Sequence, residues 1–86
     1  MPLIIDDFKK TIIIKYDNKP TPVALEFKDI DCVLVRDAFK LEGQKSIYII
    51  TKAHTEHFIK TGTPAVAQQA ADSLAQSLGG VPVLAT

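Results

Sequence analysis

The chain lacks several features that define whole classes of protein. Its 86 residues include one cysteine, Cys32, which excludes a framework of intrachain disulfides and suits a reducing compartment. Ten basic and ten acidic residues give a formal net charge of zero, which argues against a strongly electrostatic binder of nucleic acids or membranes. The four glycines build no phosphate-binding loop, so nothing predicts a nucleotide site.

Long hydrophobic segments are missing as well. Apolar runs such as residues 3–5 and 12–14 are far shorter than the ~20 residues that a membrane-spanning helix needs. Asp6 and Asp7 stand near the start, where a signal peptide has basic residues and then an apolar stretch. We therefore expect a cytoplasmic protein with no membrane partner.

What is present is a globular composition with an uneven charge distribution. The chain is 47% hydrophobic. Its length predicts one domain over residues 1–86 with a modest hydrophobic core, and oligomerisation would add to the stability of such a domain. Residues 61–86 carry one charged side chain, Asp72. This division predicts a charged β-rich body over residues 1–60 and a nearly neutral helix and tail over residues 63–86.

Hydrophobic alternation and β-branched residues predict five consecutive strands in the body. These strands are expected over residues 11–16, 23–28, 32–39, 46–52 and 54–60. A turn is expected at 17–22 and a bend at 29–31, where Asp and Asn side chains favour local hydrogen bonds. Residues 3–9 have roughly helical apolar spacing and predict one or two short helical turns, with a first strand as the alternative.

The C-terminal segment changes to helical spacing. Thr63 suits an N-cap, Pro64 suits the first helical position, and Gly79 suits the end, so we expect a helix over about residues 64–78. Residues 81–85 are apolar and uncharged, and we expect them to dock on the rest of the protein.

Two of the predicted strands, 32–39 and 46–52, are apolar on both faces. Val33 and Val35 alternate with Leu34, and Ile47 and Ile49 alternate with Tyr48. One face of a lone antiparallel sheet is usually wet, so the second face needs cover from the helix, from curling into a barrel, or from a neighbouring subunit. Five strands in so short a chain favour a small, strongly bent antiparallel barrel.

A short helical start followed by five such strands resembles the Sm-like fold of the Sm, LSm and Hfq proteins. The resemblance covers about residues 3–60. The run Ile50-Thr51-Lys52-Ala53-His54 is loosely similar to the Tyr-Lys-His turn of Hfq, with Lys52 as the matching lysine. The Asp-x-x-Met-Asn run and the Arg-Gly pair of the family are absent, and the helix is an extension of its core. Divergent small β proteins of this kind occur often in phages.

The resemblance implies a ring of five to seven subunits that binds RNA or single-stranded DNA without catalysis. Lys52, His54 and Tyr48 are the nucleic-acid-binding residues expected on this basis. The residues expected at the subunit interface are Ile47, Ile49, Phe58 and Leu74. The alternative is a structural or adaptor protein with no nucleic-acid role, such as a phage assembly or host-factor-binding component that uses the helix and tail. A third reading is a dimeric sheet-plus-helix inhibitor or antitoxin.

Residue types suited to metal binding gather at one place only. His54, Glu56 and His57 are close in sequence, but a zinc site needs three or four converging ligands, and on a strand His57 points away from the other two. We therefore expect no metal and no cofactor.

Catalytic groups are equally sparse. Cys32 lies in an apolar strand without a base nearby and reads as a small hydrophobe. The acids of the middle segment alternate with Lys28 and Arg36, which predicts a solvated surface of mixed charge. These acids are Glu26, Asp29, Asp31 and Asp37. The sequence thus predicts a protein that is not an enzyme.

Overall fold

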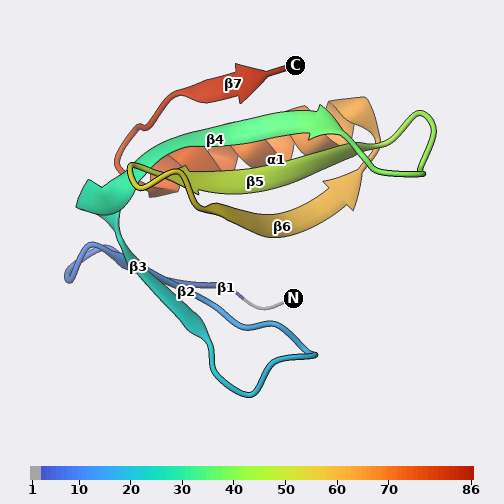
Figure 1. Ribbon diagram of the computed structural model, residues 1–86. Helices are drawn as coiled ribbons and strands as arrows, with labels where there is room; N and C mark the ends of the chain where they lie inside the picture. Colours follow the sequence, from blue (N-terminus) through green and yellow to red (C-terminus); the bar gives the residue numbers. More distant parts are fainter. Residues whose placement is uncertain (1–2) are drawn as a thin grey trace.

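The chain forms two β-sheets and one long helix in a computed structural model that describes residues 3–86 (Figure 1). A three-stranded antiparallel sheet contains β1 (Leu3–Asp6), β2 (Thr11–Ile14) and β3 (Val23–Glu26) in that order. A four-stranded sheet has the order β6 (Glu56–Gly62), β5 (Lys45–Thr51), β4 (Ile30–Asp37) and β7 (Val83–Ala85). A 3-10 helix, η1 (Phe27–Asp29), joins the sheets, and α1 (Pro64–Ser77) packs on the second.

The predicted barrel is wrong: among residues 3–86 the two sheets are separate and neither closes. The expected bend lies slightly earlier than residues 29–31, at η1, where the chain leaves one sheet and enters the other. The strand β3 pairs only with β2, whereas β4 pairs with β5 and β7. Because η1 interrupts the chain between β3 and β4, and the two strands have no partner strand in common, the long bent middle strand expected of an Sm-like barrel does not form.

The predicted N-terminal helical turn is also wrong, because residues 3–6 form β1. Leu3 and Ile5 pack on the core while Ile4 is 45% exposed, which is the alternation of a half-buried strand. The Asp6 carboxylate accepts hydrogen bonds from the backbone N–H groups of Phe8 and Lys9 and so turns the chain towards β2. The apolar spacing that suggested a helix comes from Phe8, which is 95% exposed and packs on nothing.

The other predicted strands are present, and each of their observed ends lies within two residues of the predicted end. The apolar tail docks as expected: β7 lies parallel to β4, with Val83 opposite Val33 and Leu84 opposite Leu34. Parallel pairing requires a crossover connection, and α1 supplies it. The four-stranded sheet is therefore antiparallel except at this short edge strand.

The helix expected over residues 64–78 is present as α1, with Pro64 as its first residue. Gly79 has φ +91°, and the N–H of Gly80 donates to the carbonyl of Ala75, a left-handed ending that favours glycine. The buried face consists mostly of alanines one turn apart, which let the helix lie close to the sheet. No helix within residues 3–86 is long and apolar enough to cross a membrane.

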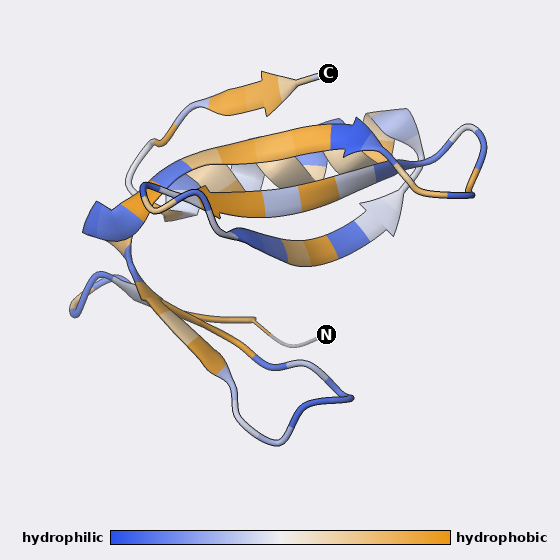
Figure 2. Ribbon diagram, in the orientation of Figure 1, coloured by the Kyte–Doolittle hydropathy of each residue, from blue (hydrophilic) through white to orange (hydrophobic). Residues whose placement is uncertain are grey.

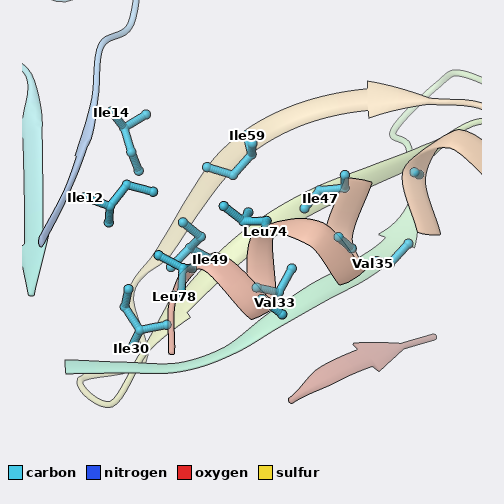
Figure 3. Close-up of a cluster of buried hydrophobic side chains, with 13 residues drawn as sticks. Ile12, Ile14, Ile30, Val33, Val35, Ile47, Ile49, Ile59, Leu74 and Leu78 are labelled. Atoms are coloured by element: carbon cyan, nitrogen blue, oxygen red, sulfur yellow. The ribbon is translucent and has the colours of Figure 1, made fainter. Parts of the chain in front are cut away.

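One hydrophobic cluster joins both sheets and the helix. Figure 3 shows Ile12 and Ile14 of the three-stranded sheet directed towards Ile59, Ile49 and Leu78. All five are at most 4% exposed. The Tyr16 hydroxyl adds a polar link, since it donates to the backbone carbonyl of Phe58 at 2.8 Å. The three-stranded sheet is thus tied to the β6 side of the larger one.

Truncation of Ile14 tests whether the two sheets share this core. Ile14→Ala should lower the free energy of unfolding by about 2–4 kcal/mol, because a fully buried isoleucine leaves a cavity. Urea unfolding followed by circular dichroism should show one transition. Ile4→Ala, on the opposite face of the same sheet, is the matched control and should cost less than about 1 kcal/mol. Two separate transitions in the wild-type chain would contradict a shared core.

Candidate functional site: the open face of the four-stranded sheet

One face of the four-stranded sheet has no cover from any element of residues 3–86. The helix α1 packs against the face that carries Val33, Val35, Ile47 and Ile49. In Figure 1, α1 lies behind β4 and β5, and no other element crosses in front of them. We call this uncovered side the open face.

Four apolar side chains form a continuous row across the open face, which we call the apolar row. In register across the strands, its members are Leu84 of β7, Leu34 of β4, Tyr48 of β5 and Phe58 of β6. The rings of Tyr48 and Phe58 meet edge to face, with centroids 5.7 Å apart. Phe58 is 39% exposed and Leu84 is 51% exposed. Figure 2 shows β4 as a nearly continuous run of hydrophobic residues, in orange. Since successive residues of a strand face opposite sides, β4 presents apolar side chains to both sides of the sheet.

An ion pair lies over the centre of the apolar row. The Arg36 guanidinium is 4.0 Å from the centroid of the Tyr48 ring, and its Nη2 is 2.7 Å from Oε1 of Glu56. The hydrogen bond to Glu56 raises the pKa of Arg36, which keeps the guanidinium charged at every working pH. The pair holds the ring of Tyr48 in place and adds no net charge to the open face.

The rest of the open face is small or internally paired. Hydroxyls of Ser46 and Thr61 bond each other at 2.9 Å. Ile50 completes the apolar area beside Tyr48. The face therefore has an apolar centre and polar groups whose charges cancel.

Only part of the expected nucleic-acid site comes together. Tyr48 lies on the open face, whereas Lys52 and His54 lie in the exposed turn between β5 and β6. That turn is fixed by a bond from the Lys52 N–H to the Asp29 carbonyl, at 2.8 Å, and His54 adopts φ +66°. About 13 Å of strand length separates Tyr48 from Lys52, so Tyr48 stands apart from the other two expected residues.

The expected interface residues divide in the same way. Ile47, Ile49 and Leu74 are no more than 8% exposed and belong to the protein's own core, so they are not exposed to a second subunit. The reason is alternation: the odd-numbered residues of β5 face α1, and Leu74 faces them from the helix. Phe58 alone of the four is accessible to a second subunit.

Groups suited to metal binding or catalysis do not converge. Glu56 turns to the open face and Arg36, while His57, on the other side of β6, bonds the Thr55 hydroxyl at 3.1 Å. Among residues 3–86 no group of three or more His, Cys, Asp or Glu side chains could hold a metal ion. Burial and then the nearby Asp31 raise the pKa of the Cys32 thiol, which makes it a weak nucleophile.

Sequence reasoning missed several residues of the open face: Leu34, Arg36, Glu56 and Leu84. One sequence signal pointed to these residues: strand 32–39 has apolar residues on both sides, which indicates that both of its faces are buried by other groups. Which strands lie beside it, and hence which side chains complete the row, depends on the register across β4, β5, β6 and β7.

Comparison of the chain with protein-family models, with curated proteins and with solved structures found no match. The function is therefore argued from the residues and their geometry.

The environment of His57 predicts a pH-dependent stability. Burial and then the nearby Lys19 lower the pKa of His57 below its ordinary value of 6.5. The unfolded chain then binds more protons than the folded one just below pH 6.5, so the free energy of unfolding falls as the pH drops through this range. Urea titrations between about pH 7.5 and about pH 5.5 should show this loss for the wild type and a smaller loss for His57→Gln.

The matched control is His54→Gln, in the exposed turn three residues earlier. It should keep the pH dependence of the wild type. An equal loss in all three proteins would show that His57 does not cause the effect.

Proposed function

We propose that the protein is a non-enzymatic structural or adaptor protein that binds another protein chain through the open face. The observation that carries this proposal is the apolar row, which lies in register across all four strands of the sheet and is partly exposed. Monomeric proteins rarely leave a continuous apolar patch uncovered unless it meets a partner.

The residue types of the open face support a protein partner. Tyrosine, phenylalanine and arginine are enriched in the cores of protein interfaces, and lysine is depleted there. Tyr48 and Arg36 lie on the two inner strands of the sheet, beside Phe58 on the edge strand β6. Tyrosine and arginine are also the residues that most often carry binding energy.

The face is rigid before any partner arrives. Its side chains stand on strands that are hydrogen-bonded to neighbours, and Tyr48 is held between Arg36 and Phe58. Little conformational entropy is therefore lost on binding, which leaves more of the burial free energy for affinity. Complete burial of side chains of this size is worth about 1.5–3 kcal/mol each, and the exposed parts of Phe58 and Leu84 supply a share of that.

Charge argues against a nucleic acid on this face. Binding to phosphates relies on unpaired basic side chains, whereas Arg36 beside the row is paired with Glu56. Tyr48 offers less for stacking, because the guanidinium of Arg36 already covers its ring. Of the two functions expected from sequence, the geometry therefore supports the protein-binding one better. The tail contributes to it through Leu84, whereas the inner side of α1, Leu74 included, is buried.

Photo-cross-linking from the open face tests the proposal. The photoreactive analogue p-benzoylphenylalanine is incorporated in place of Phe58 in cells that express the full chain, and in place of Phe39 as the control. Phe39 is 83% exposed in the loop between β4 and β5, away from the row. We expect protein adducts from position 58 well above those from position 39, because the benzophenone reacts only with groups that it touches.

Equal yields from the two positions would contradict the proposal. So would an adduct at position 58 that nuclease treatment removes, since it would assign a nucleic acid to the open face.

A further inference from the structure

We infer that the partner seated on the open face is a second copy of this chain, in a reversible face-to-face dimer. The inference rests on the proposed function and adds the identity of the occupant. It is carried by three features of the open face: its symmetry, its charge and its size.

The apolar row is complementary to itself. Tyr48 lies within the row, with Leu34 on one side and Phe58 on the other. A two-fold axis in the plane of the interface and through Tyr48 lays the row of one copy along the row of the other, whether the axis runs along the strands or across them. Two sheets stacked in this way pack ~10 Å apart with their side chains interdigitated. The second apolar layer that strands β4 and β5 require is then supplied by the same strands of the partner copy.

Charge also favours a second copy over a strongly charged partner. The two charged groups beside the row are Arg36 and Glu56, and they neutralise each other at 2.7 Å. An acidic or a basic partner would find no uncompensated charge to pair with, and desolvation of the ion pair would oppose its binding. A partner face without net charge meets a lower electrostatic cost, and the same face of a second copy has none. Desolvation of the Arg36–Glu56 pair of each copy keeps the association weak.

The size of the face sets the strength of the association. Four strands spaced ~4.8 Å apart are ~19 Å wide, and a seven-residue strand such as β5 is ~23 Å long. The face of each copy therefore offers roughly 440 Å² of projected area, or roughly 900 Å² for two copies. Specific stable interfaces bury about 1,200–2,000 Å², and smaller ones belong to weak or transient complexes. We therefore expect a dimer that forms and dissociates with concentration, with a dissociation constant in the micromolar range.

Sedimentation velocity of the full chain tests the inference. From ~1 µM to ~500 µM the weight-average mass should rise from 9.4 kDa towards twice that value, 18.8 kDa. Phe58→Lys should weaken association at least ~10-fold, because it places a charge within a desolvated patch. Phe39→Lys makes the same chemical change at the loop phenylalanine and should leave the dissociation constant unchanged.

A second variant guards against a folding defect. Leu84→Lys alters a half-exposed side chain of the edge strand β7 and should weaken the dimer in the same direction. Circular dichroism at low concentration checks that each variant keeps the wild-type spectrum.

Two outcomes overturn the inference. One is a wild-type chain that stays monomeric up to ~500 µM, and the other is a dimer that persists in folded Phe58→Lys and Leu84→Lys proteins. Either leaves the proposed function to be decided separately, since cross-linking from position 58 to a different chain requires no self-association. Absence of any protein adduct at position 58 would overturn both.

Discussion

Packing of α1 against one face of β4 and β5 is the interaction on which the rest of the structure depends. Val33, Val35, Ile47 and Ile49 meet a helix face built mostly of alanines, so sheet and helix lie close together. The same layer extends past Leu78 to Ile12 and Ile14, which brings the three-stranded sheet onto the end of the helix (Figure 3). A single layer of aliphatic side chains therefore holds all three parts, and such a layer is what a chain of this length can bury.

The same packing creates the open face. One 14-residue helix covers one side of the sheet, and the chain has no second helix within residues 3–86 to cover the other. Leu34, Tyr48, Phe58 and Leu84 are consequently left in a row that no element of residues 3–86 covers. The Arg36–Glu56 pair limits the cost of this exposure, because it shields the Tyr48 ring while the partner is absent. A face whose central ring is shielded in this way suits a partner that binds reversibly.

Local chemistry could be predicted from the sequence, and long-range pairing could not. Thr63, Pro64 and Gly79 mark the ends of α1 by their backbone preferences alone, so the helix was found. The apolar residues on both faces of strands 32–39 and 46–52 likewise predict that both faces are buried. Periodicity does not indicate which element covers each face, because that depends on long-range pairing. Residues 27–29, for example, form η1 and direct β3 and β4 into different sheets. Likewise Ile47 and Ile49 were assigned to an interface because alternation defines two faces without saying which one α1 takes. The expected barrel failed at this step, since it required a closed strand pairing that residues 3–86 do not make.

The most direct test of the central claim, that a second copy covers the open face, is footprinting of its phenylalanine with hydroxyl radicals. Oxidation of Phe58 is measured by mass spectrometry at ~1 µM and ~500 µM protein, on either side of the expected micromolar dissociation constant. Phe8 and Phe39, which are 95% and 83% exposed in loops remote from the row, serve as internal references. The account predicts that Phe58 becomes protected at the higher concentration while Phe8 and Phe39 react equally at both. Oxidation of Phe58 that stays constant relative to both references would contradict it.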